Sequence, residues 1–189
     1  MADEQVVADP ALGTGLLEEL VADGLGDQAL VQGAESDGAD LTVAEALDSP
    51  ELLTGDRIAT EGIDAALAVL SDELDLREEE IVRVPAMFAE LVIEDYPRQG
   101  IVANHLPAIA NGVETGAGSF LAIGPHGPLD AAGEDVYAAA EEGFAAVGSR
   151  ISWVEAWDYG HAVGTVGGEV HCLTNALRDQ SAAEPWRQA

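Results

Sequence analysis

The amino-acid sequence predicts an α/β protein folded as a single domain over residues 1–189. Short apolar runs of strand length alternate with longer segments whose apolar residues recur at the spacing of an amphipathic helix. Hydrophobic residues make up 48% of a chain that is long enough to bury one core. Glycine and proline fall between these segments, where they end helices and form turns. Together the three features favour layers of alternating strands and helices.

The first forty residues are predicted to form strand, helix, strand and loop. Residues 5–8 are an apolar run of strand length, and leucines and a valine recur at helical spacing over residues 12–21. Gly24 is placed to stop this helix. Residues 28–32 fit a second short strand, and residues 34–40 an acidic loop.

Two helices are predicted next. Thr42 and Glu45 have the spacing of a capping box, which begins a two-turn helix that closes near Ser49-Pro50. Residues 56–74 form the strongest helical pattern in the chain, with one apolar stripe that we expect to lie in the core. The stripe consists of Ile58, Ile63, Ala66, Leu67, Leu70 and Leu74.

The second half reads as short strands around one helix. A strand over residues 81–84 is ended by Pro85, and a loop-like stretch spans residues 104–119. An Ala-rich helix over residues 134–147 is capped by Gly148. The remaining predicted strands are residues 101–103, 120–123 and 151–154.

The only cysteine of the chain lies in a glycine-flanked segment, GGEVHCLTN, at residues 167–175. Paired glycines allow close approach of the backbone to another backbone or a ligand, and residues 170–173 fit a short strand. A cysteine held there, with His171 beside it and hydroxyl and amide groups just after, is a candidate nucleophile. The alternative is that Cys172 is a small buried hydrophobic residue, as many free cysteines are.

GEVHCLTN resembles the nucleophile segment of the protein-arginine deiminases, GEVHC-x-TN, and more loosely the GG-x-x-HC core of the agmatine deiminases. Residues 41–88 resemble the helices, the E-L-x-L turn and the I-x-x-(I/V)-P-x-(L/M)-F strand end of the first family, and residues 6–33 are similar to it more weakly. The resemblance covers nearly the whole chain, but only the C-terminal part of that family's catalytic domain.

The resemblance implies a partial α/β propeller of the pentein type, roughly two ββαβ modules of five. It also implies hydrolysis of arginine or peptidyl-arginine to citrulline and ammonia, with Cys172 as the nucleophile that forms a thiouronium intermediate. That chemistry needs a histidine for proton transfer and carboxylates to hold the guanidinium group.

The family supplies these groups from an H-V-D-E segment and from further upstream, and this sequence has no His-x-Asp. We therefore expect them to come from another chain or from a longer reading frame, and we predict no substrate-binding residue. His161 is the best internal candidate for a general acid–base, and His171 is expected to have a structural role. His105 and His126 are expected to be surface residues in turn-rich loops.

Two alternatives stay open. The chain is a non-catalytic remnant that acts as a binding or regulatory module, or it is an agmatine deiminase-like enzyme. In either case an isolated sector of a propeller leaves strand and helix faces uncovered, so we expect a partner chain or a homo-oligomer.

The charge balance excludes some partners and suggests a salt-adapted protein. The chain has 36 acidic residues, seven arginines and no lysine, for a formal net charge of −29. Such a field opposes binding to nucleic acid and to anionic membranes. The acids are spread over amphipathic segments and not blocked in a tail, so we interpret the surface as halophilic. Molar salt screens such charges over about 3 Å.

The sequence gives no sign of export or of a cofactor. One cysteine permits no internal disulfide, the N-terminus lacks the features of a signal peptide, and no apolar run approaches the roughly 20 residues of a membrane span. We expect a cytoplasmic protein. No zinc-ligand spacing, P-loop or dinucleotide fingerprint is present. We therefore expect no metal and no cofactor; calcium is implied only by the family resemblance, with ligands outside this chain.

Overall fold

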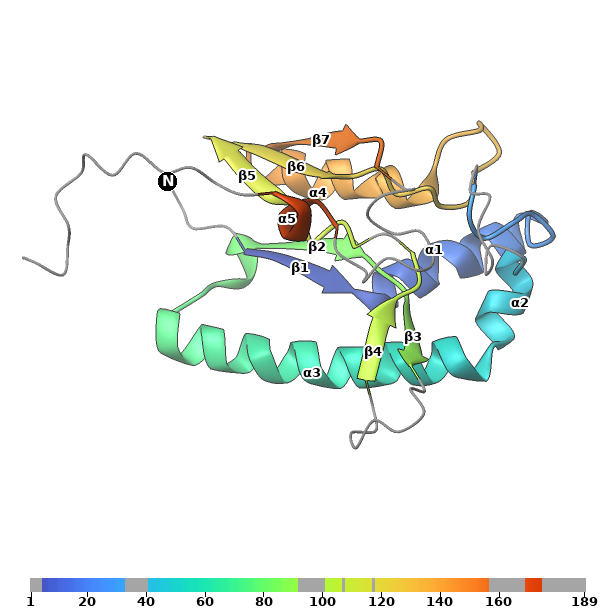
Figure 1. Cartoon of the computed structure of the whole chain (residues 1–189), viewed down its shortest axis with the longest axis horizontal. Helices are drawn as coiled ribbons and strands as arrows, with labels where there is room; N and C mark the ends of the chain where they lie inside the picture. The colour runs from blue at the N-terminus through green and yellow to red at the C-terminus, as the bar shows by residue number, and fades with distance from the viewer. Residues whose placement is uncertain are drawn as a thin grey trace, which may run out of the picture.

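The computed structural model describes residues 5–32, 41–91, 101–106, 108–116, 118–156 and 169–174. They form a mixed α/β structure with several small sheets, as predicted (Figure 1). In chain order the elements are β1 Gln5–Asp9, α1 Pro10–Ala22, α2 Val43–Asp48, α3 Pro50–Leu74, η1 Glu78–Glu80, β2 Ile81–Pro85, β3 Phe88–Leu91, β4 Ile101–Asn104, β5 Val113–Gly116, β6 Ser119–Ile123, η2 Val136–Ala139, α4 Ala140–Ala146, β7 Arg150–Val154 and α5 Val170–Leu173.

The first unit is a parallel pair of strands, β1 and β2, with three helices between them in the chain. The register runs from Gln5 opposite Ile81 to Asp9 opposite Pro85. Asp9 also begins α1, because its carboxylate accepts the Leu12 amide at 3.0 Å. Strand β1 and helix α1 therefore lie close to where the sequence predicts them.

The segment after α1 differs from its prediction. Residues 28–32 form no strand; only an isolated bridge joins Ala29 to Thr42. The side chain of Gln28 accepts the Leu129 amide and donates to the Leu129 carbonyl, both at 2.8 Å. This segment therefore pairs with a distant loop and has no neighbouring strand among the described residues. The acidic loop predicted for residues 34–40 and the turn predicted at Tyr96-Pro97 lie outside the described residues.

The predicted capping box is confirmed. The Glu45 amide donates to Thr42 Oγ1 at 3.2 Å, and the Thr42 amide donates to Glu45 Oε2 at 2.9 Å. The Thr42 amide and the Thr42 hydroxyl both donate to the Glu45 carboxylate and so lower its pKa. Helix α2 ends where predicted, at Ser49, but Ser49 also caps the next helix and Pro50 stands in its first turn. Helix α3 therefore begins at Pro50, six residues earlier than predicted.

The apolar stripe of α3 is only partly in the core, contrary to the prediction. Leu52, Gly55 and Ala59 are buried. Beyond Ala59 the stripe residues are at most half-buried, and Leu74 is 65% exposed. Figure 1 shows why: the C-terminal turns of α3 extend past the ends of β1 and β2.

The second unit has the ββαβ order that the resemblance implies. Strands β5 and β6 pair antiparallel, and β6 pairs in parallel with β7 after η2 and α4. Strand β5 was predicted as part of a loop; three of its four residues pair with β6, with a register shift between Glu114 and Gly116. A further antiparallel pair, β3 with β4, links the two units. The described residues form no closed barrel or propeller.

The helix of the second unit is shorter than predicted. Asp135 caps it by accepting the Tyr137 amide at 2.8 Å, and the segment begins as the 3₁₀ turn η2 before α4. Gly148, with φ +78°, follows α4 as a left-handed stop.

Glycines bring the helices of the first unit into contact with its backbone. A Cβ at Gly13 of α1 would overlap the Ala86 carbonyl oxygen, and one at Gly55 of α3 would overlap that of Phe88. One hydrophobic core spans both units. Its buried members include Leu17, Leu20, Leu30, Val43, Leu52, Val82, Val84, Met87, Leu106, Ile109, Tyr137 and Phe144.

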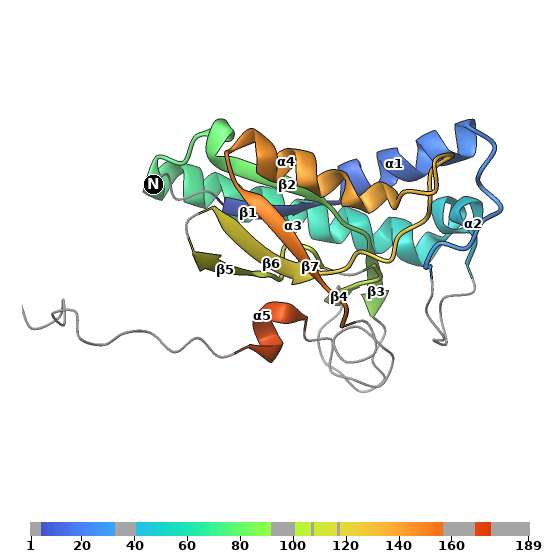
Figure 2. The same cartoon turned by 90° about the horizontal axis from the view of Figure 1, so that it is seen from above.

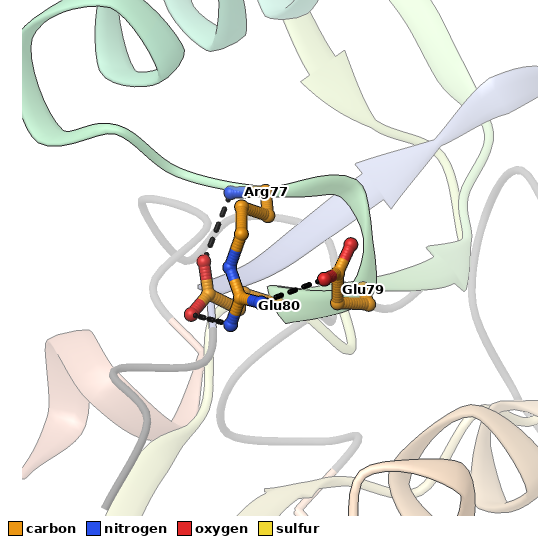
Figure 3. A network of polar contacts seen from close by, with 3 residues as sticks. All are labelled: Arg77, Glu79 and Glu80. Atoms are coloured by element: carbon orange, nitrogen blue, oxygen red, sulfur yellow. Dashed lines mark hydrogen bonds and ion pairs between the residues drawn. The ribbon is translucent and has the colours of Figure 1, made fainter.

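Arginine is used locally to neutralise neighbouring carboxylates. Arg77, between α3 and β2, contacts Glu79 at 2.8 Å and Glu80 at 2.7 Å, and its amide donates to the Glu80 carboxylate at 2.9 Å (Figure 3). The bonds to Arg77 lower the pKa of Glu80. Arg83 likewise contacts Glu78 at 3.0 Å. Exposed pairs of this kind contribute little to stability.

Candidate functional site

The candidate nucleophile Cys172 lies in a single helical turn and not in a strand. Residues 170–173 form α5, with Glu169 at the N-cap and the Thr174 amide bonded to the His171 carbonyl at 3.3 Å. The strand predicted for residues 170–173 is therefore wrong.

Helix α5 is held against the second unit by its first residues. The His171 amide donates to the Asn111 carbonyl at 3.0 Å, and Val170 is 5% exposed. Figure 2 shows α4 on one side of the β5–β6–β7 sheet and α5 on the other. The backbone of α5 thus lies beside β6, on the side of the sheet away from α4.

Glu169 is a feature that the sequence reasoning missed. Its side chain is 2% exposed, which makes it the only charged residue among the described ones that is fully buried. Buried carboxylates are rare unless they are paired. The only signal in the sequence is its place between paired glycines and the apolar Val170, and that pattern fits an exposed acid equally well.

The histidines are distributed differently from the prediction. His171 is exposed, and His161 lies outside the described residues. His105 is half-buried, with its amide bonded to the Met87 carbonyl at 2.8 Å. The His126 side chain is only 17% exposed. The expectation that His105 and His126 are surface residues is therefore wrong.

His126 joins the two units at the carboxyl ends of β6 and β7. Its Nδ1 lies 3.2 Å from the Gln32 carbonyl, and its Nε2 lies 3.0 Å from Glu155 Oε1. The Gln32 amide in turn donates to the His126 carbonyl at 2.9 Å. With φ +49°, His126 has a left-handed backbone that is uncommon for a non-glycine residue. These contacts account for its burial and give it a structural role.

Two partly buried carboxylates accept backbone amides from other segments of the chain. Asp56 accepts the Phe88 amide at 2.7 Å, and burial raises its pKa to about 6. Asp135 accepts the Gly127 amide at 2.7 Å, and burial raises its pKa as well. Both act as backbone anchors in the structure.

The described residues do not assemble a complete catalytic constellation around α5. They contain no group of three or more His, Cys, Asp or Glu side chains that could hold a metal ion, so the donors needed for calcium are not gathered in this part of the chain. No helix in this part has the length and apolar character needed to cross a membrane. What the site offers is a positioned backbone for the cysteine segment.

The chain is a mixed α/β protein with one ββαβ unit. Its cysteine lies on a single helical turn, α5. The sequence profile of the protein-arginine deiminase family matches residues 4–187, and the chain belongs to that family. Membership indicates deiminase-like function and arginine-containing substrates in general. A comparison with curated proteins finds none that matches the chain.

Proposed function

We propose that this chain contributes the thiol to a deiminase that converts arginine or peptidyl-arginine to citrulline and ammonia, with Cys172 as its nucleophile. The observation that carries the proposal is the family match over residues 4–187, which includes the whole GGEVHCLTN segment. The docking of α5 on the Asn111 carbonyl adds support, because a nucleophile has to be held in a fixed position relative to its substrate.

The reaction divides into two displacements. The Cys172 thiolate adds to the central carbon of the guanidinium group; a C–N bond breaks, and the nitrogen leaves as ammonia after a histidine donates a proton to it. Water, deprotonated by the same histidine, then adds to the thiouronium carbon. The C–S bond breaks, and citrulline and the thiolate are released.

The proton-transfer and guanidinium-binding groups are proposed to come from outside these 189 residues. None of the four histidines is followed two residues later by an aspartate, and the ring of His126 is already in contact with the Gln32 carbonyl. A second polypeptide, or a segment encoded upstream, that carries His-x-Asp would complete the centre. The surface around α5 would then form an interface, either with that polypeptide or within a homo-oligomer.

No metal or other cofactor enters the proposed reaction; if calcium acts in the complete enzyme, its ligands belong to the complementing part. The net charge of −29 favours a cationic substrate and a cytoplasm of high salt content. We propose neither nucleic acid nor membrane as a partner.

The test is citrulline release from benzoyl-arginine amide in molar KCl. The chain should be assayed alone and with the product of the reading frame upstream of its gene. We expect activity only in the mixture, and its loss in Cys172→Ala. Activity that survives Cys172→Ala would refute the nucleophile assignment. An inactive mixture whose upstream frame lacks His-x-Asp would favour the non-catalytic module, and release of carbamoylputrescine from agmatine would favour the agmatine deiminase-like alternative.

A further inference from the structure

The loop before β5 is hydrogen-bonded to the first turn of α5. The His171 amide is in the first turn of α5, and amides in a first helical turn have no acceptor within the helix. Its acceptor is the Asn111 carbonyl at 3.0 Å, in a turn that is closed by a bond from the Asn111 amide to the Ala108 carbonyl at 2.8 Å. One backbone hydrogen bond therefore connects this loop to the residue next to Cys172.

Gly112 allows the loop to lie directly against β6. A Cβ at this position would overlap Cε1 of Phe120 and would lie 2.5 Å from the Leu121 carbonyl oxygen. Both contacts are far shorter than side chains tolerate. Any other residue at position 112 would have to separate the loop from the strand.

Neither neighbour can easily make room. The Phe120 ring packs on Phe144, with ring centroids 4.9 Å apart, and Phe144 is 2% exposed in the core. The Leu121 backbone is held on both sides, since Leu121 is paired with Val113 of β5 and Ser152 of β7. The overlap caused by a side chain at position 112 is therefore relieved by movement of the loop, and the Asn111 carbonyl moves with the loop.

We infer that Gly112 is a positioning residue for the candidate nucleophile: it lets the Asn111 carbonyl reach the His171 amide and so fixes the backbone of Cys172. The catalytic meaning of this inference rests on the proposed function, whereas the contacts themselves do not. Displacements of about 1 Å are enough to lower an enzymatic rate about 100-fold.

The test compares Gly112→Ala with a matched control, Gly13→Ala. The control also forces a methyl group into a backbone contact, with Ala86, but on α1 in the first unit. In molar KCl, amide exchange at His171 is measured by NMR and alkylation of Cys172 by iodoacetamide is followed across pH. We expect the His171 amide to exchange about tenfold faster in Gly112→Ala, as for the loss of one hydrogen bond. We also expect the rate of Cys172 alkylation to depend on pH differently from the wild type. Gly13→Ala should be less stable than the wild type, but its His171 exchange rate and its Cys172 alkylation profile should equal those of the wild type.

Wild-type exchange and alkylation in folded Gly112→Ala would overturn the inference, and so would the same changes in Gly13→Ala. If Gly112→Ala does not fold, Gly112→Ala combined with Phe120→Ala removes the ring contact and keeps the carbonyl contact. Its His171 exchange should exceed that of Phe120→Ala alone, and equal rates would overturn the inference. None of these measurements needs turnover. Citrulline release by Cys172→Ala would refute the proposed function and leave the docking result intact.

Discussion

Asp56 provides a proton-linked change in stability that can be predicted from its contacts. It lies on α3, where its carboxylate accepts the Phe88 amide at 2.7 Å and the Thr14 hydroxyl at 3.4 Å, and so joins α1, α3 and β3. Burial raises its pKa from 3.8 to about 6 although both hydrogen bonds oppose the rise. The folded state therefore binds a proton at Asp56 more tightly than the unfolded state does.

The sign follows from linkage. The stabilisation is fully present below pH 3.8 and is lost as the pH rises through about 6. A pKa change of this size corresponds to about 3 kcal/mol for a fully shielded group. Asp56 is only half-buried, so screening by solvent reduces the expected effect to about 1–2 kcal/mol.

Asp56→Asn tests this reasoning, because an amide oxygen can still accept the Phe88 amide but carries no charge. We expect the variant to match the wild type near pH 4 and to exceed its free energy of unfolding by about 1–2 kcal/mol above pH 7. Urea unfolding in molar KCl across this range measures the difference. Asp64→Asn, at an exposed position of the same helix, controls for the loss of one negative charge. An Asp56→Asn variant with the wild-type dependence on pH would refute the argument.

Three further outcomes are expected. Tyr137 is fully buried and its hydroxyl has no hydrogen-bond partner among the described residues, so Tyr137→Phe should leave the free energy of unfolding unchanged or raise it by about 1 kcal/mol; a clear loss would reveal a bonded hydroxyl. Thr42→Ala should lower it by about 1 kcal/mol, and Glu45→Ala should add little in that background because the two residues form one capping box; fully additive losses would contradict this. Dialysis from molar KCl to about 0.1 M should abolish the folded circular-dichroism signal, and an unchanged spectrum would remove the halophilic interpretation.

The elements that the sequence predicts well are those defined by local chemistry. The capping box at Thr42 and the helix-ending glycines Gly24 and Gly148 all act within a few residues. Strand β5 and the single turn α5 depend on distant partners instead: β5 needs β6, and α5 needs the Asn111 carbonyl. No local pattern reveals such partners.

Boundaries and burial were harder to predict for a similar reason. Ser49-Pro50 reads equally as the end of one helix or the start of the next, and in the structure it is both. The apolar stripe of α3 predicts a buried face along its whole length, but only the part that meets the sheets is covered. The burial of His126 depends on Gln32 and Glu155, which are far from it in sequence.

The candidate site could be located from the sequence but not assembled from it. The GGEVHCLTN segment identified Cys172. The burial of Glu169 and the role of Gly112 appear only once β6 and the loop before β5 are in place. A glycine whose missing side chain makes room for an aromatic ring looks in the sequence like any turn glycine.

The most direct test of the central claim is to trap the covalent intermediate. The chain, mixed with the complementing polypeptide in molar KCl, would turn over benzoyl-arginine amide carrying isotope at the guanidine carbon, and the reaction would be quenched in acid. The thiouronium mechanism predicts label on the peptide that contains Cys172, and none in Cys172→Ala. Citrulline release with no labelled peptide, or with the label on another residue, would contradict it.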